Sequence, residues 1–227
     1  MKRLFDIIVA AGALVALSPV IGIAALGIRL SSPGPFFFGA ERVGLAGRKF
    51  TMYKLRTMHE SGADDGRRIT AKGDSRVFPY GALLRRLKID ELPQLLNVLR
   101  GDMSVVGPRP EDSDIVENYF TELQLKTLTV RPGLSSPGGI YNYTHGEKLL
   151  TGDNPEIEYI EKLMPIKLAL EGVYVSHQSF FYDMRIILRT IWVISCQAAG
   201  RREYPDPPEM RAAQEIVAQG ISRAQNF

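Results

Sequence analysis

Cysteine is nearly absent from this chain, which has one, Cys196, among 227 residues. A single cysteine excludes a disulfide within the chain and a cysteine-rich zinc site, and it is consistent with a reducing compartment. Strong charge is also missing, because the formal net charge is only +3. A value this small does not indicate a nucleic-acid-binding protein, so we expect no nucleic-acid partner. The arginines that are clustered favour small anions or a lipid surface instead.

Charge is scarcest near the start of the chain. Between Leu4 and Ile28 the only charged residue is Asp6, and this segment is long enough to cross a hydrocarbon core of roughly 30 Å. We therefore expect it to contact a membrane. A signal peptide is a competing interpretation, but the apolar run is longer than an h-region of about 7 to 15 residues, and no convincing cleavage site follows it.

The same segment carries two signs that it does not simply span the bilayer. Ser18-Pro19 lies in its middle and should bend a helix, with the serine hydroxyl available to a backbone carbonyl that the proline frees. Basic residues flank both ends, which by the positive-inside rule places both ends in the cytoplasm; they are Lys2 and Arg3 before the segment and Arg29, Arg42, Arg48 and Lys49 after it. The sequence thus favours a re-entrant helix, and an ordinary kinked span stays open.

A β-hairpin is expected next. Two β-rich runs within residues 36–58 are joined by a turn at residues 44–47. Alternation along the second run places Lys54 and Arg56 on the face that begins with Phe50 and Met52. Solvated charges on a strand remain an alternative for these two cations. Residues 59–76, polar and rich in glycine, indicate a loop.

The stretch KIDELPQLL, residues 88–96, predicts a break between two short helices. Proline inside a helix costs about 3 kcal/mol or more, so Pro93 must begin a new helix instead of continuing one. Asp90 and Glu91 lie at this break, and Arg85 precedes them by about a turn. Such a helix end favours anions, and a carboxylate there could hold Mg²⁺ against a diphosphate. A simple capping role for Asp90 stays open.

Two proline-glycine turns each present one arginine. They are VGPRP at residues 106–110, with Arg109, and VRPG at residues 130–133, with Arg131. Proline restricts these turns, which suits bidentate phosphate contacts, although exposed loop arginines would look the same. Further on, residues 179–199 have the pattern of a helix in a membrane interface, with a core-packed helix as the alternative. Residues from 200 onward resemble a peripheral tail.

Taken in order, the motifs resemble the bacterial sugar transferase family, the monotopic phosphoglycosyl transferases. The matching motifs cover roughly residues 1–195 and are RLFDIIVA, SPV, PGPFFF, ERVG, FTMYKLRTM, KIDELPQLLNVLRGDMSVVGPRP and VRPG. The resemblance implies a mostly helical α/β (α+β) fold with a small β-hairpin and interfacial amphipathic helices around a compact catalytic core. We expect a re-entrant membrane helix at 1–30, a catalytic domain at 31–199 and a tail at 200–227.

The resemblance also implies an activity: transfer of a phosphosugar from a UDP-sugar to a polyprenyl (undecaprenyl) phosphate, with release of UMP, to start glycoconjugate or exopolysaccharide assembly. Asp90 would be the nucleophile that forms a covalent phosphosugar intermediate, and Glu91 a metal helper or proton acceptor. The phosphate-binding cations would be Lys54, Arg85, Arg109 and Arg131, with Mg²⁺ held at Asp90 and Glu91. The expected location is the cytoplasmic face of the bacterial inner membrane.

Two stretches depart from the family pattern. Many members follow the RPG turn with Thr-Gly-Trp-Ala-Gln, where this chain has LSSPGGIYNY, and many carry an aspartate near the position of Glu171. No role is assigned to either stretch. A membrane-anchored nucleotide-sugar hydrolase and a noncatalytic membrane scaffold remain alternative functions. The sugar, the pathway and the formation of a homodimer are left open.

Overall fold

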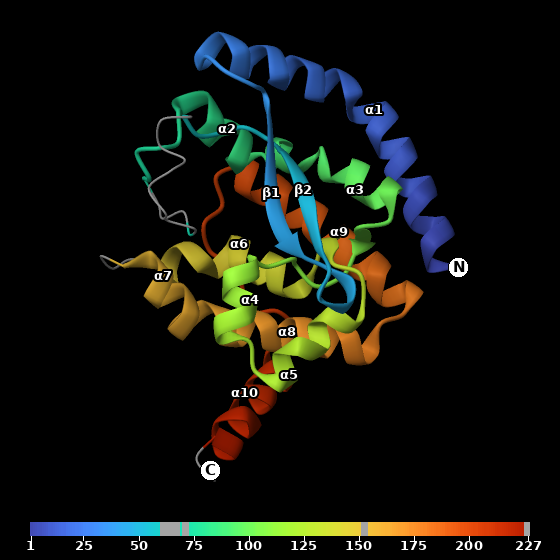
Figure 1. The fold of residues 1–227 in the computed structure, drawn as a ribbon, viewed down its shortest axis with the longest axis vertical. Helices are drawn as coiled ribbons and strands as arrows, with labels where there is room; N and C mark the ends of the chain where they lie inside the picture. The colour runs from blue at the N-terminus through green and yellow to red at the C-terminus, as the bar shows by residue number, and fades with distance from the viewer. Residues whose placement is uncertain (60–68, 70–72, 151–153, 225–227) are drawn as a thin grey trace.

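The computed structural model describes residues 1–59, 69, 73–150 and 154–224, and helices make up most of it. In Figure 1, α1 runs along one edge, a β-hairpin crosses the centre, and α10 projects at the far end. The elements are α1 Lys2–Ser31, β1 Phe37–Val43, η1 Leu45–Gly47, β2 Lys49–Leu55, α2 Pro79–Arg86, η3 Ile89–Glu91, α3 Gln94–Arg100, β3 Ser104–Val106, α4 Ser113–Tyr119, α5 Glu122–Leu125, η4 Lys126–Thr129, β4 Gly133–Ser135, α6 Pro137–Leu149, α7 Pro155–Glu158, η5 Tyr159–Leu163, α8 Met164–His177, α9 Phe180–Ala198 and α10 Met210–Ala224.

The N-terminal segment forms one helix, α1, with Pro19 inside it. Pro19 cannot donate to the carbonyl of Val15, and the Ser18 hydroxyl donates to that carbonyl instead, at 2.8 Å. Figure 1 shows α1 bent near its middle. Both the bend and the serine contact confirm the sequence prediction. Within the described residues, α1 is the one helix long and apolar enough to cross a membrane, with a mean hydropathy of 2.4.

Both ends of α1 are attached to the same body of the protein. Near the start, Asp6 is buried and accepts hydrogen bonds from the Ser104 hydroxyl at 2.9 Å and the Val105 amide at 3.0 Å. Near the other end, Ile28 is buried in an apolar cluster with Leu55, Phe78 and Leu84. The lone charge of the apolar segment therefore lies in the protein interior rather than in lipid.

The β-hairpin forms as predicted. β1 and β2 pair antiparallel from Phe37 opposite Leu55 to Val43 opposite Lys49, and η1 makes the turn. Lys54, in β2, and Arg56, just after it, have different roles. Lys54 lies 3.5 Å from Glu91, which together with Asp90 is called the dyad below. Arg56 is buried and donates to the carbonyls of Ser32 and Pro35, so it fixes the chain that leaves α1.

A second, two-stranded sheet was not predicted. β3 and β4 pair in parallel, Ser104 opposite Gly133 and Val106 opposite Ser135. The two proline-glycine turns follow and precede these strands, so Gly107 and Gly133 lie back to back. A Cβ added at Gly133 would fall 2.0 Å from the Gly107 amide nitrogen. Glycine is required here because the two backbones approach so closely.

The C-terminal half packs around α8, with α6 and α10 against it. The predicted helix over residues 179–199 is α9, and its outward residues include Phe181, Leu188 and Trp192. The tail forms α10, which is held to α9 by Glu209 through Arg189 at 2.9 Å and Tyr182 at 2.9 Å. Most of the loop predicted at residues 59–76 lies outside the described residues.

Candidate active site

The expected helix break is present between α2 and α3, and it is filled by the short 3₁₀ turn η3. Lys88 has a left-handed backbone conformation, with φ of 56°, and this reverses the chain so that Asp90 and Glu91 point inward. Both carboxylates are buried. Pro93 takes the N-cap position of α3, and neither η3 nor α3 has a side-chain cap hydrogen bond. The alternative that Asp90 serves as a helix cap is therefore wrong.

Glu91 is surrounded by donors. Its Oε1 accepts from Arg109 Nη2 at 2.6 Å and lies 3.5 Å from Lys54 Nζ, and its Oε2 accepts from the Tyr143 hydroxyl at 3.0 Å. Burial alone would raise the pKa of Glu91, but Arg109, Lys54 and Lys88 outweigh it and hold that pKa well below its usual range. Glu91 is thus a fixed negative charge at neutral pH.

Asp90 has a different environment. Among the described residues, its buried Oδ1 has no hydrogen-bond partner, and neither has either polar atom of the buried Gln94 side chain one turn later. Burial and the neighbouring Glu91 raise the pKa of Asp90, against the pull of Lys54, Lys88 and Arg85. The cations therefore stabilise ionised Asp90 only in part, against the opposing effects of burial and of Glu91.

Three of the four predicted cations lie around the dyad. Lys54 and Arg109 contact Glu91 directly, and Arg85 acts on Asp90 by charge while its Nε donates to Thr57 Oγ1 at 2.7 Å. Burial lowers the pKa of both Lys54 and Arg85. Arg131 is not brought into this group. Its Nε donates to the carbonyl of Gly101, at the end of α3 remote from Asp90.

Lys88 and Tyr143 belong to the site although no role was predicted for them. The Lys88 ammonium lies 3.6 Å from the centre of the Tyr143 ring, a cation–π contact. Tyr143 comes from α6, within the LSSPGGIYNY stretch that departs from the family pattern. Lys88 directly precedes the predicted break, so the sequence could have indicated it as a site residue. Tyr143 is 52 residues from Glu91 in the chain, and no local pattern connects the two.

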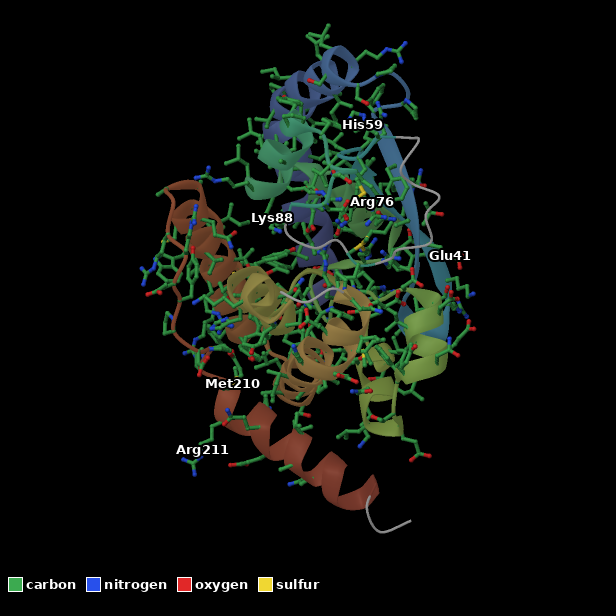
Figure 2. All side chains as sticks on the ribbon, turned by 90° about the vertical axis from the view of Figure 1, so that its left-hand side faces the viewer. Glu41, His59, Arg76, Lys88, Met210 and Arg211 are labelled. Carbon is green, nitrogen blue, oxygen red and sulfur yellow. The ribbon has the colours of Figure 1, made fainter. Side chains whose placement is uncertain are left out.

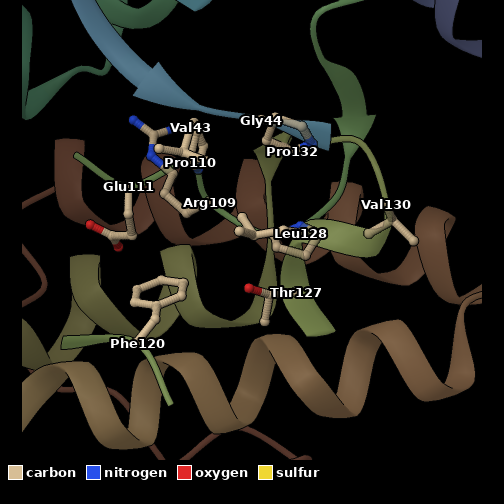
Figure 3. A pocket seen from close by; sticks show the side chains of 11 residues that line it. Val43, Gly44, Arg109, Pro110, Glu111, Phe120, Thr127, Leu128, Val130 and Pro132 are labelled. Carbon is tan, nitrogen blue, oxygen red and sulfur yellow. The ribbon is translucent and has the colours of Figure 1, made fainter. Parts of the chain in front are cut away.

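The backbone of Arg109 is fixed by a hydrogen bond to Glu171 of α8. Glu171 Oε1 accepts from the Arg109 amide at 3.1 Å and from the Ser136 hydroxyl at 2.6 Å, and burial raises the pKa of Glu171 to about 7. A cavity of about 10 Å³ lies beside this segment, lined by Arg109, Glu111 and Phe120 among others (Figure 3). It has room for about one water molecule and is too small for a substrate.

The residues around the dyad could hold a magnesium ion only together with oxygens from a bound substrate. The described residues include no cluster of three or more His, Cys, Asp or Glu side chains that could hold a metal alone. Mg²⁺ commonly needs only one or two carboxylates, with substrate phosphates and waters completing its shell. The unpartnered Oδ1 of Asp90 and Oε1 of Gln94 are suitable oxygen donors, whereas the oxygens of Glu91 are already engaged.

Buried carboxylates ringed by cations beside a long apolar helix define a site suited to phosphorylated substrates at a membrane. The comparisons agree: the model of the family described as "Bacterial sugar transferase" matches residues 1–197. The chain belongs to that family.

The relatives of this chain include sugar-phosphate transferases by name. The UDP-glucose:undecaprenyl-phosphate glucose-1-phosphate transferase of Caulobacter vibrioides is 39% identical over 194 residues, which is 84% of this chain and 68% of the relative. The UDP-N-acetylgalactosamine-undecaprenyl-phosphate N-acetylgalactosaminephosphotransferase of Aeromonas hydrophila is 36% identical over 86% of this chain and 43% of its own length. The uncharacterized sugar transferase EpsL of Bacillus subtilis is 37% identical, over 84% of this chain and 85% of EpsL. The chain thus spans less than half of the Aeromonas relative.

Proposed function

We propose that this protein transfers a phosphosugar from a UDP-sugar to undecaprenyl phosphate and releases UMP. The observation that carries the proposal is the pairing of two unlike carboxylates, a fully engaged Glu91 and an Asp90 with one unpartnered oxygen, inside a ring of cations. The names of the relatives support UDP-sugar and undecaprenyl phosphate as the substrate classes. A role in exopolysaccharide assembly is consistent with them.

In the first step, an oxygen of Asp90 attacks the β-phosphorus, which carries the sugar. The bond from that phosphorus to the bridging oxygen breaks, and UMP leaves with the bonding electron pair. The product is a phosphosugar linked to Asp90 as an acyl phosphate. Lys54, Lys88 and Arg85 offset the repulsion between an ionised Asp90 and the diphosphate, because all three lower its pKa through their charge.

In the second step, a phosphate oxygen of undecaprenyl phosphate attacks the same phosphorus. The bond to Asp90 breaks, the carboxylate is restored, and the sugar leaves on a lipid diphosphate. Asp90 and Gln94 would hold Mg²⁺, which when bound would supply neutralisation of the negative charge on the leaving group. Glu91 stays ionised throughout and positions Arg109, Lys54 and Tyr143 around the transferring phosphoryl group.

The lipid substrate requires a site at the membrane surface. α1 is apolar, bent at Pro19 and attached to the body of the protein at both ends, as a helix that enters and leaves on one side would be. This supports a monotopic protein on the cytoplasmic face of the inner membrane. There, a soluble nucleotide sugar and a lipid phosphate can reach one site.

The test is a UMP-release assay with undecaprenyl phosphate against a panel of UDP-sugars that includes UDP-glucose and UDP-N-acetylgalactosamine. We expect release that depends on both the lipid and Mg²⁺. Release that is independent of the lipid would indicate a nucleotide-sugar hydrolase instead. If no UMP is released and no labelled UMP exchanges into any UDP-sugar, the protein is a noncatalytic scaffold.

The same assay distinguishes the roles of Asp90 and Glu91. Asp90→Asn should abolish turnover and the phosphosugar adduct, since an amide cannot replace the nucleophile. Glu91→Gln should keep a slowly formed adduct, because Asp90 remains. Intact-protein mass spectrometry after incubation with UDP-sugar and Mg²⁺, without lipid, measures both adducts. An undiminished adduct on Asp90→Asn would move the nucleophile elsewhere, with Glu91 the first candidate.

A further inference from the structure

A second cationic cavity lies at the end of α3 that is remote from the dyad. Its volume is about 290 Å³. The residues that line it include Lys2, Arg3, Asp6, Thr129, Arg131 and Gln178. The volume is several times the share of about 30 Å³ that one water occupies, so the cavity can admit a phosphate with part of a headgroup. Arg131, the predicted phosphate ligand that the dyad lacks, is one of its walls.

Three cations meet at this cavity, and two of them are in no ion pair within the described residues. Arg3 donates to the carbonyls of Val98 at 2.6 Å and Leu99 at 2.9 Å. Arg131 donates through Nε to the carbonyl of Gly101 at 2.9 Å. Both guanidinium groups are therefore oriented by backbone carbonyls at the end of α3, which do not neutralise a full positive charge. Lys2, the third, pairs with Asp183 at 2.5 Å.

Asp6, the one carboxylate among the described residues that line the cavity, offsets only one of these three positive charges. Asp6 is buried, and it accepts from the Ser104 hydroxyl and the Val105 amide. Both of its oxygens thus face Ser104 and Val105 of β3. Thr129 and Gln178 add neutral polar groups to the walls. The cavity therefore offers a net positive, partly enclosed environment for an anion.

The position of the cavity identifies the source of that anion. Lys2 and Arg3 begin α1, and the residues that follow on its outer side, Leu4, Ile7 and Ile8, are exposed and apolar. Phe5 contacts Phe180 at a ring-centroid distance of 5.5 Å, and the adjacent Phe181 is 83% exposed. Apolar side chains of this kind beside paired arginines are typical of the level where acyl chains meet headgroups.

We propose that this cavity binds the phosphate of an anionic membrane lipid. Arg3 and Arg131 contact the phosphate, Lys2 assists from the rim, and the acyl or prenyl chains lie along the first turns of α1 and the start of α9. The site is separate from the dyad because α3, about 10 Å long, lies between them. The phosphate belongs either to a bilayer phosphodiester lipid or to the phosphomonoester of a polyprenyl phosphate. The proposal does not depend on the transfer reaction.

The test measures bound lipid rather than activity. The full-length protein, in detergent, is titrated with phosphatidylglycerol, polyprenyl phosphate, phosphatidylcholine or inorganic phosphate, and native mass spectrometry counts the adducts. We expect Arg131→Gln to weaken binding of an anionic lipid roughly five- to tenfold, the effect of about one cation at a membrane surface. Arg211→Gln is the matched control, because Arg211 is 93% exposed on α10, far from α1 (Figure 2).

Each outcome bears on the proposal. Preferential binding of phosphatidylglycerol assigns the site to a bilayer lipid, and preferential binding of polyprenyl phosphate assigns it to the carrier lipid; both support it. Equal binding by Arg131→Gln and the unmodified protein overturns it, as does equal binding of phosphatidylcholine. Binding of inorganic phosphate without lipid preference shows an adventitious anion only and also overturns it. If Arg131→Gln does not fold, Lys2→Gln, at the partly exposed rim, replaces it.

Discussion

At the residue level, the two carboxylates of the dyad differ in their hydrogen bonds: both oxygens of Glu91 accept hydrogen bonds, whereas Asp90 Oδ1 has no partner among the described residues. Glu91 accepts from Arg109 and Tyr143 and lies beside Lys54, so its pKa is too low for it to act as a base near neutral pH. This favours an electrostatic role for Glu91 over the proton-accepting one. The pKa of Asp90 is raised, so its ionised form depends on Lys54, Lys88 and Arg85 for stabilisation.

The hydrogen bond from Tyr143 to Glu91 should contribute to activity. Tyr143→Phe removes one donor to Glu91 but keeps the aromatic ring next to Lys88. Loss of one hydrogen bond to a charged group costs about 1.5 to 3 kcal/mol, so we expect UMP release to fall by roughly ten- to a hundredfold. Tyr119→Phe, at an exposed position of α4, is the control. Unchanged kinetics for Tyr143→Phe would mean that Arg109 and Lys54 suffice to hold Glu91.

Glu171 should make folding stability depend on pH. Its pKa is about 7 in the folded protein against 4.5 for the free side chain, so the folded state holds its proton more tightly than the unfolded state does. Stability from this group is full below about pH 4.5 and is lost as pH rises toward 7, by roughly 3 kcal/mol at most.

Glu171→Gln should therefore flatten the pH dependence of the melting temperature over that interval. The glutamine oxygen can still accept from Ser136 and the Arg109 amide. Melting curves at pH 5, 6, 7 and 8 measure the effect. Two parallel pH profiles, one for each protein, would mean that Glu171 has an ordinary pKa.

At the level of elements, the sequence predicted what local rules determine. The hairpin and the break at Pro93 follow from alternation, glycine turns and the missing proline N–H, all within about ten residues. The parallel pairing of β3 with β4 joins segments 29 residues apart (Ser104 with Gly133) and three residues long, too short to show a pattern. Tyr143 was missed for the same reason, because only the packed α6 brings it to Glu91.

The back-to-back glycines make a sharp test of that second sheet. Gly133→Ala places a Cβ 2.0 Å from the Gly107 nitrogen and 2.3 Å from its carbonyl oxygen, so one backbone must move. We expect a loss of at least about 1 to 3 kcal/mol of stability and a displaced Arg109 turn. Gly172→Ala in α8 is the control, since its nearest contact would be Ile216 Cδ1 at an ordinary 3.9 Å. A melting temperature for Gly133→Ala equal to that of the control would contradict the close pairing.

At the level of the whole molecule, α1 is joined to one body at both ends while its middle faces outward. Arg3 and Asp6 fix the first turns to α3 and β3, and Ile28, with Tyr80 packed against Gly27, fixes the last turns to α2. A helix that crossed the bilayer would carry one of these ends to the far side and break its contacts. The bend at Pro19 removes that conflict.

We therefore expect both ends of α1 to be reached from the cytoplasmic side alone. In a Cys196→Ser background, a single cysteine replaces either Lys2, near the start of α1, or the exposed Leu30, near its end. A membrane-impermeant maleimide is then applied to intact cells and to inverted vesicles. Labelling of both sites only in inverted vesicles supports a re-entrant helix. Labelling of one site in intact cells shows a span. Pro19→Ala restores the donor to Val15 and should straighten α1, so a fraction of molecules should then expose one end to the periplasm.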